Sequence, residues 1–231
     1  MEVFLKPCYM AVFQLDSGLW FPNPYYGEES GLVAIGGDLS PERLLLAYSN
    51  GFFPWYSFTS KFKPQWYCPL DRFVIFPDEL HVSHSLKTLL NKGRYELTFN
   101  EAFGRVIEGC SKVDGRYGME GAWLGDEMMQ AYKEMHRLGY AKSVEVWEKG
   151  DESGQRRLVG GLYGIYLGNA FFGESMFSLV PSASKIALVY LSGLAREHGW
   201  HFIDCQFETP HLKAMGSRHI SYDEYLGMLH N

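Results

Sequence analysis

A two-residue connection between two long apolar segments is the strongest constraint on the fold of this 231-residue chain. The segments are RLVGGLYGIYL (157–167) and AFFGESMF (170–177), and Gly168 and Asn169 stand between them. Two residues can join antiparallel strands but not parallel ones, and glycine and asparagine suit such a hairpin turn. A third apolar segment, AKSVEVWE (141–148), leads to the first through the polar loop KGDESGQR. The sequence therefore predicts an antiparallel meander of three strands.

The segments after the meander indicate how the sheet continues. Ser182 or Ser184 can cap the amphipathic helix KIALVYLSGLAREHG, which stops at Gly199. The stretch HFIDCQF (201–207) then alternates like a further strand. A meander, a crossing helix and a returning strand predict an α+β sheet fold with flanking helices, and a V-shaped opening where the helix leaves the sheet.

The first part of the chain differs from the rest, and we expect residues 1–68 to form a small N-terminal domain and 69–231 the larger one. The small part is rich in proline, glycine and aromatic residues. It contains one well-delimited helix, in which Ser40 can cap the start and Gly51 ends the last turn. We expect this one main helix and little other regular structure. Further along, helices are expected to begin at Ser83 and Asn100.

Composition excludes several functional classes. The net charge of −6 gives no overall attraction for a polyanion, so a nucleic acid would have to bind local basic surface. The apolar segments are far shorter than a membrane span, and the start MEVFLKPCYM lacks the pattern of a signal peptide. The four cysteines are widely spaced and show no zinc-binding pattern. We therefore expect a cytoplasmic protein with free thiols, no metal and no membrane partner.

Polar residues inside the predicted last strand are the first sign of a functional site. The period of two places Asp204 and Gln206 on one face and Cys205 on the other. A buried carboxylate and amide need partners, so the pair either bonds neighbouring backbone or serves chemistry. In the functional interpretation, Asp204 accepts a hydrogen bond from the side-chain amide of Gln206, whose oxygen then faces a reacting group. Cys205 with a nearby histidine is an alternative nucleophile, but its face favours a buried core thiol.

A carboxylate inside an aromatic strand and tryptophans in loops are further candidates. Glu174 lies in FFGESMF and is either an edge residue facing solvent or part of a site, and Met176 beside it suits either core or an adaptable pocket. Trp55, Trp66 and Trp123 lie in glycine- and proline-rich stretches. Aromatic faces of this kind stack on unpaired bases or pack between domains, and packing is the expectation for Trp66.

These motifs occur together and in a characteristic order: AIGGDLSPERLLLAYSNGFFPWY, GAWL, FFGESMFS, SASKIALVYL, and DCQF before HLKAMGS. From about Phe21 to Gly216 the chain resembles the leucyl/phenylalanyl-tRNA–protein transferases. The resemblance implies an acetyltransferase-like (GNAT-like) larger domain without a cofactor. It also implies the activity: transfer of leucine, or less readily phenylalanine, from aminoacyl-tRNA to acceptor proteins with N-terminal Arg or Lys, which marks them for degradation in bacteria.

Carried over onto this sequence, the resemblance assigns roles to individual residues. The catalytic group comprises Asp204, Gln206 and Glu174. The apolar pocket for the aminoacyl side chain comprises Leu162, Phe171, Met176 and Ile203. The terminal adenosine of the tRNA is held by Trp55 and Trp123. In a regular strand Phe171 and Met176 would face opposite sides, so either a bulge at Gly173 brings both to the pocket or one of them is core.

Two other functions compete with this one. Coenzyme-A-dependent N-acyltransferases bind pyrophosphate at a glycine-rich strand-to-helix turn, and the nearest approach here, RLVGGL from Arg157, runs on into a predicted strand. A catalytically silent aminoacyl-tRNA-binding module is the other alternative. The presence of Asp204, Gln206 and Glu174 together disfavours it.

Overall fold

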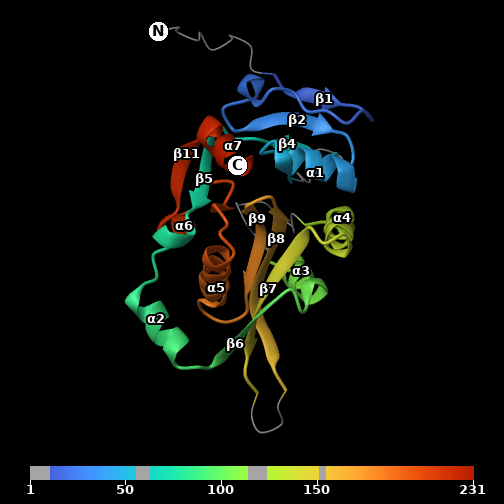
Figure 1. Ribbon diagram of the computed structural model, residues 1–231. Coiled ribbons are helices and arrows are strands. Elements are labelled where there is room, and N and C mark those ends of the chain that lie inside the picture. The colour runs from blue at the N-terminus through green and yellow to red at the C-terminus, as the bar shows by residue number, and fades with distance from the viewer. Residues whose placement is uncertain (1–10, 56–62, 114–123, 151–154) are drawn as a thin grey trace, which may run out of the picture.

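The computed structural model describes residues 11–55, 63–113, 124–150 and 155–231, which form two β-sheets with flanking helices. Figure 1 shows the small sheet above the large one. The small sheet has the order β1-β2-β4-β3. Its strands are β1 (Phe13–Leu15), β2 (Leu32–Gly36), β3 (Phe53–Trp55) and β4 (Gln65–Tyr67). A 3-10 turn, η1 (Pro24–Tyr26), and the helix α1 (Pro41–Ser49) complete this part.

Helix α1 begins and ends where the sequence predicts. The Ser40 hydroxyl oxygen accepts a hydrogen bond from the backbone N–H of Arg43 at 3.4 Å, and Gly51 has a φ of +76°. The expectation of little other regular structure is wrong, because a four-stranded sheet accompanies the helix. Its strands are three to five residues long, too short to show a clear alternation in the sequence.

The large sheet has seven strands in the order β11-β5-β10-β9-β8-β7-β6. They are β5 (Asp71–Ile75), β6 (Tyr95–Phe99), β7 (Ala141–Glu148), β8 (Arg157–Leu167), β9 (Ala170–Ser178), β10 (Phe202–Asp204) and β11 (Arg218–Ser221). The predicted meander is β7-β8-β9, and Leu167 pairs with Ala170 across the two-residue turn. Strand β10 runs parallel to β9, so the sheet is mixed.

Helices cover both faces of the large sheet (Figure 1). Helix α5 (Ala183–Glu197) packs on one face, and α3 (Phe103–Ser111) and α4 (Asp126–Arg137) pack on the other. The remaining elements are α2 (His84–Asn91), η2 (Pro77–Glu79), α6 (Pro210–Lys213) and α7 (Tyr222–Leu229). The architecture is therefore mixed α+β. No helix in the ranges given above is long and apolar enough to cross a membrane.

Two predicted helix starts need adjustment. Helix α3 begins at Phe103 because Asn100 adopts a left-handed conformation, with a φ of +62°. Ser182 occupies the cap position of α5 but makes no capping hydrogen bond with its side chain. The hydroxyl of Ser178, at the end of β9, accepts the hydrogen bond from the Ser184 N–H at 2.8 Å instead.

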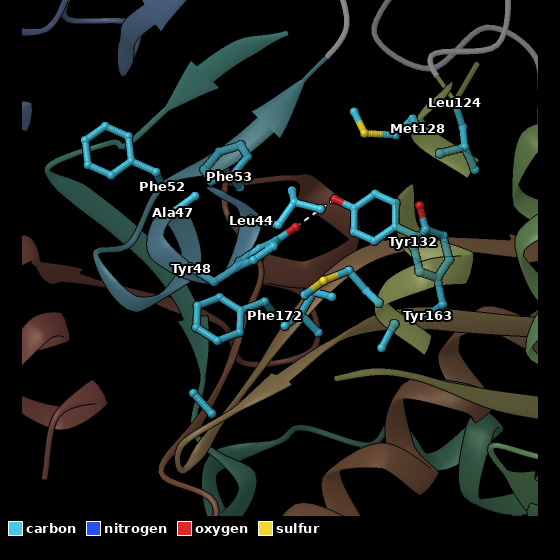
Figure 2. Packing of buried hydrophobic residues seen from close by; sticks show 14 of the residues in the cluster. Leu44, Ala47, Tyr48, Phe52, Phe53, Leu124, Met128, Tyr132, Tyr163 and Phe172 are labelled. Carbon is cyan, nitrogen blue, oxygen red and sulfur yellow. Dashed lines mark hydrogen bonds between the residues drawn. The ribbon is translucent and has the colours of Figure 1, made fainter. Parts of the chain in front are cut away.

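The two sheets share a hydrophobic core. Leu44, Ala47 and Tyr48 of α1 pack in one cluster with Met128 and Tyr132 of α4 and with Phe172 of β9. Figure 2 shows Tyr48 above Phe172 and facing Tyr132. The chain passes from the small sheet to the large one between Tyr67 and Asp71. Residues from both parts therefore meet above the middle of the large sheet.

Candidate active site

The site lies where two parallel strands diverge. Strands β9 and β10 pair along Ala170–Phe172 and Phe202–Asp204. Beyond that point β9 continues to Ser178, while the other segment turns away at Gln206, which has a φ of +64°. A cavity of about 100 Å³ lies in the resulting opening. The V-shaped opening predicted from the sequence is thus present.

The cavity is apolar along most of its wall and polar at one end. The apolar residues are Leu162, Met176, Leu188, Leu191, Ile203 and Leu212. The polar end is formed by Glu174, Asp204 and Gln206, together with Ser175 and Cys205. Leu188 and Leu191 come from α5 and Leu212 from α6. Sequence reasoning placed Leu188 and Leu191 in an amphipathic helix and gave Leu212 no role, since nothing in their spacing distinguishes a pocket wall from a core.

A β-bulge shapes β9 at the polar end. Gly173 pairs with Gly164, and Ser175 pairs with Tyr163, the neighbouring residue on β8. Glu174 is therefore an extra residue on β9, and such an insertion re-aims the side chains that follow it. Of the two alternatives for Phe171 and Met176, the bulge beside Gly173 is present, and Glu174 occupies it.

The bulge places Phe171 and Met176 on the same face of the sheet. Both pack in the cluster on the α5 side that also contains Leu162 and Ile203. Met176, Leu162 and Ile203 line the cavity, as predicted. Phe171 does not line the cavity, and its ring is stacked on that of Trp200 at a centroid distance of 5.8 Å. The expectation that Phe171 lines the pocket is therefore wrong, because its ring packs against Trp200.

The carboxyl group of Glu174 is the centre of a buried polar cluster. Its Oε1 accepts hydrogen bonds from the Tyr48 hydroxyl at 2.8 Å and from Nε2 of Gln206 at 3.1 Å. Its Oε2 accepts from the Tyr132 hydroxyl at 2.6 Å. Burial raises the pKa of Glu174 to about 7, against the lowering effect of the two tyrosine hydroxyls. Glu174 is thus a buried group, not the solvent-facing edge residue that was its alternative.

The two tyrosine hydroxyls also contact each other, at 2.7 Å (Figure 2). Three oxygen–oxygen contacts therefore link Tyr48, Tyr132 and Glu174. With Glu174 protonated, the three groups carry three hydrogens, one for each contact, and the carboxyl group then donates to one tyrosine hydroxyl instead of accepting from it. With Glu174 ionised, two hydrogens serve three contacts, which is a less favourable arrangement. This count agrees with a carboxyl group that keeps its proton close to neutrality.

Asp204 makes a different set of contacts from the one predicted. Its Oδ1 accepts the backbone N–H of Gln206 at 2.8 Å and Nε of Arg72 at 2.9 Å. Its Oδ2 accepts Nη2 of Arg72 at 2.6 Å and the Tyr225 hydroxyl at 2.9 Å. The predicted bond from the Gln206 side chain to Asp204 is wrong. The strand ends at Asp204, and the left-handed backbone at Gln206 sends its side chain to Glu174 instead.

Cys205 does not have the properties of a nucleophile. Burial raises the pKa of its thiol to about 12, so the reactive thiolate is absent at neutral pH. The sulfur lies 3.7 Å from the Ile203 carbonyl oxygen and 3.9 Å from the Ser217 hydroxyl. Strand parity placed Cys205 in the core, away from Asp204 and Gln206; this is wrong, because the strand ends at Asp204, and Cys205 is half-buried and lines the same cavity.

One of the tryptophans lies beside the site. Trp55, at the end of β3, is half-buried, and its ring centroid is 5.5 Å from that of Phe207, the residue after Gln206. Trp66 is fully buried in the small sheet, where its indole N–H donates to the Gly36 carbonyl at 2.9 Å. Trp66 is therefore a packing residue, as expected. Trp123 lies outside the described residues.

Besides the three leucines of the cavity wall, the sequence did not point to four residues that contact Asp204 or Glu174: Arg72, Tyr225, Tyr48 and Tyr132. An arginine inside the apolar segment DRFVIF is a signal that could have found Arg72, since a buried charge requires a partner. The tyrosines sit at ordinary helix-core spacing, so only the fold reveals that their hydroxyls meet carboxylates. Among the described residues, no group of three or more His, Cys, Asp or Glu side chains could hold a metal ion.

The glycines of RLVGGL serve packing. The segment lies within β8, so no strand-to-helix turn for a pyrophosphate follows it. A Cβ added at Gly160 would lie 2.4 Å from Cβ of Ala183, the first residue of α5. The absence of a side chain there lets the helix start close against the strand. The feature that would have supported a coenzyme-A-dependent enzyme is therefore explained by the fold.

An apolar cavity that ends at an oriented amide suits an enzyme that aligns an apolar group for transfer. Comparison with known proteins identifies the class. The family model "Leucyl/phenylalanyl-tRNA protein transferase" matches residues 74–230, and the model of that family's N-terminal domain matches residues 37–70. A relative named leucyl/phenylalanyl-tRNA–protein transferase from Syntrophobacter fumaroxidans is 48% identical, over 95% of this chain and 90% of the relative. One of the same name from Myxococcus xanthus is 48% identical, over 90% and 86%.

These matches cover nearly the whole chain at high identity. The chain belongs to the leucyl/phenylalanyl-tRNA protein transferase family, whose members are aminoacyltransferases. Similarity to solved structures is weaker. The crystal structure of FemX gives a TM-score of 0.48 at 11% identity, over 78% of this chain and 66% of that one. The structure of L-PGS from Bacillus licheniformis gives 0.40 at 15% identity, over 80% and 58%. Both scores are too low to assign a fold.

Proposed function

We propose that this protein transfers leucine, or less readily phenylalanine, from aminoacyl-tRNA to the α-amino group of proteins that begin with Arg or Lys. We further propose a small domain over residues 1–68 and an acetyltransferase-like (GNAT-like) catalytic domain over 69–231. Family membership supports the reaction. The observation that carries the catalytic assignment is the Gln206 amide, held by Glu174 at the polar end of the apolar cavity.

The reaction replaces an ester bond by an amide bond. The neutral amine of the acceptor attacks the carbonyl carbon of the aminoacyl ester, the bond to the ribose oxygen breaks, and that oxygen regains a proton as the amine loses one. Aminoacyl-tRNA is already activated, so the step needs no ATP. The enzyme's main contribution is alignment, which can supply about 7 to 11 kcal/mol of the barrier reduction.

Gln206 is suited to aligning the attacking amine. Because its Nε2 donates to Glu174, its carbonyl oxygen is the atom that remains to accept an N–H of the acceptor. An amide is a very weak base, so it directs the amine without removing its proton in advance. Glu174 fixes the direction of the amide. A second role for Glu174, binding the aminoacyl ammonium or the acceptor's basic side chain, would require its ionised form.

The cavity accounts for an apolar aminoacyl group. A charged side chain entering a wall of leucine, isoleucine and methionine would lose its hydration without gaining a partner. Apolar side chains of different size are separated much less strongly. Met176 is flexible, and its displacement would make room for a ring. Leucine requires no displacement of Met176, so it should fit this pocket more readily than phenylalanine.

The tRNA end is expected to lie against Trp55, whose ring stands beside the segment that carries Gln206. In this proposal Trp55 and Trp123 hold the terminal adenosine by stacking. The protein is acidic overall, so few basic residues can contact phosphate. Binding of the tRNA should therefore weaken only gradually as salt is added.

The test is a transfer assay with defined donors and acceptors. Leucyl-tRNA is mixed with peptides that begin with Arg, Lys, Ala or Asp, and mass spectrometry follows the gain of one leucyl residue. Acetyl-coenzyme A, and free leucine with ATP, are the control donors. We expect product from leucyl-tRNA with the Arg and Lys peptides. Modification from acetyl-coenzyme A would favour the acyltransferase alternative, and tRNA binding without any product would favour the silent binding module.

Replacing Gln206 by Ala tests the site itself. We expect kcat to fall about 10- to 100-fold, as for a lost positioning contact, with tRNA affinity within about twofold of wild type. Gln14→Ala is the matched control, because Gln14 is an exposed glutamine whose amide bonds backbone in the small sheet. An equal loss of tRNA affinity and turnover in Gln206→Ala would make Gln206 a structural residue.

A further inference from the structure

We propose that Arg72 and Tyr225 are positioning residues for the transfer step. Together they clamp Asp204, and Asp204 in turn holds the backbone of Gln206. In this arrangement Asp204 anchors the reacting amide and does not accept a proton from the substrate. The inference rests on the proposed function, because it concerns how that same site is held in place.

The clamp is built from charge-assisted hydrogen bonds between fully buried side chains. Arg72 approaches Asp204 with Nε at 2.9 and 3.0 Å from the two oxygens and with Nη2 at 2.6 Å. The side chain of Arg72 is 1% exposed and that of Asp204 is 0% exposed. Two donors on one planar guanidinium fix the carboxylate in orientation as well as in position.

The acceptor capacity of Asp204 is used up. Its oxygens receive Nε and Nη2 of Arg72, the hydroxyl of Tyr225 and the backbone N–H of Gln206. A carboxylate has about four lone-pair positions, so four donors occupy it fully. Burial alone would lower the pKa of Arg72, but the Asp204 carboxylate raises it above its ordinary value. No acceptor position remains for an attacking amine.

The bond to the backbone explains the unusual conformation of Gln206. A left-handed backbone is unfavourable for a residue with a long side chain, and here φ is +64°. The N–H of Gln206 donates to Asp204 at 2.8 Å, and the N–H of Cys205 donates to the Phe73 carbonyl at 2.9 Å. These bonds hold the turn from two sides. This backbone conformation directs the side-chain amide of Gln206 toward Glu174.

Distant parts of the chain meet at the clamp. The guanidinium carbon of Arg72 lies 4.7 Å from the ring centroid of Phe53 and 4.9 Å from that of Tyr225. Phe53 belongs to the small sheet and Tyr225 to the C-terminal helix α7. Both rings pack against the guanidinium by cation–π contact. Residues from both parts of the chain therefore contact the clamp.

The kinetic experiment compares Tyr225→Phe and Arg72→Lys with wild type. Phenylalanine keeps the ring but loses the hydroxyl, and lysine keeps the charge but loses the paired contact. Transfer of leucine to an Arg-peptide is measured well below the unfolding temperature of each variant. The rate is divided by the concentration of sites that bind leucyl-tRNA, which gives kcat per active site. We expect kcat per site to fall about 10- to 100-fold, with KM for the tRNA within twofold. Tyr222→Phe is the matched control on the same helix, because the Tyr222 hydroxyl bonds the Asn50 carbonyl and not Asp204.

A second readout does not depend on activity. Hydrogen exchange of the Gln206 backbone N–H, followed by NMR, should be at least about tenfold faster in Tyr225→Phe and Arg72→Lys, and unchanged in Tyr222→Phe, since protection follows the local opening equilibrium. A fall in kcat without faster exchange would overturn the proposal, because Asp204 would then act by another route. Faster exchange without a fall in kcat would equally overturn it. Should wild type transfer nothing, the proposed function fails, while the exchange measurement still tests the clamp.

If Arg72→Lys does not fold, Tyr225→Phe alone decides, because it leaves the buried ion pair intact. Wild-type kcat per site together with wild-type exchange in that variant would show that the hydroxyl of Tyr225 positions nothing.

Discussion

The stability of the protein should depend on pH through Glu174. The folded state raises the pKa of this carboxyl group from its ordinary value of 4.5 to about 7. The folded protein therefore holds the proton more tightly than the unfolded chain. The contribution is fully present below about pH 4.5 and is lost as pH rises through 7. A shift of about 2.5 units corresponds to about 3 kcal/mol of unfolding free energy.

The variant Glu174→Gln isolates this contribution, because glutamine has nearly the same shape but does not titrate. Urea unfolding of wild type and variant between pH 4.5 and 8 gives two curves, and their difference removes the effect of the other titrating groups. Wild type should lose about 3 kcal/mol relative to the variant across this range. Glu134→Gln is the control, since Glu134 is exposed and the Arg137 hydrogen bond lowers its pKa. A difference curve for Glu174→Gln that stays flat would refute the assignment of a proton to Glu174.

Three other substitutions or treatments test the site and the fold. Met176→Ala enlarges the cavity and should shift the preference from leucine toward phenylalanine in a competition between the two aminoacyl-tRNAs; an unchanged ratio would place Met176 outside the pocket. Cys205, with a thiol pKa of about 12, should resist iodoacetamide at pH 7.5 in the folded protein, and rapid labelling seen by mass spectrometry would contradict this raised pKa. Gly164→Ala would place a Cβ 2.1 Å from the Phe172 carbonyl oxygen, so urea unfolding should show a loss of about 1 to 3 kcal/mol. Gly104→Ala, where nothing lies within 4 Å, should instead be neutral or slightly stabilising, and equal losses in both would refute the packing argument.

Elements defined by neighbouring residues could be predicted from the sequence. The hairpin at Gly168 and Asn169 and the helix capped by Ser40 both appear as expected, because turn and cap chemistry act over a few residues. The strands of the small sheet, and β5 and β11 of the large one, were not predicted. Each has three to five residues and acquires its partners from distant segments. Pairing at long range leaves no local pattern.

The same distinction holds within the site. Glu174, Asp204 and Gln206 attract notice in the sequence because polar side chains interrupt apolar strands. Their partners do not, since Arg72 lies 132 residues before Asp204 and Tyr48 lies 126 residues before Glu174. The misassigned hydrogen bond has a local cause that the sequence conceals. A left-handed glutamine breaks strand parity, and parity was the basis of the prediction.

The two buried carboxylates of the site behave differently because their partners differ. Asp204 forms an ion pair with a guanidinium, whereas Glu174 contacts two hydroxyls and an amide, and burial raises its pKa to about 7. The two groups hold Gln206 at opposite ends, Asp204 through the backbone N–H and Glu174 through the side-chain Nε2. In a glutamine fixed at both ends, the side-chain carbonyl oxygen is an acceptor that can turn toward a substrate. An oxygen of that kind can guide an amine but cannot deprotonate it. The reaction it suits is therefore one whose donor is already activated, as an aminoacyl ester is.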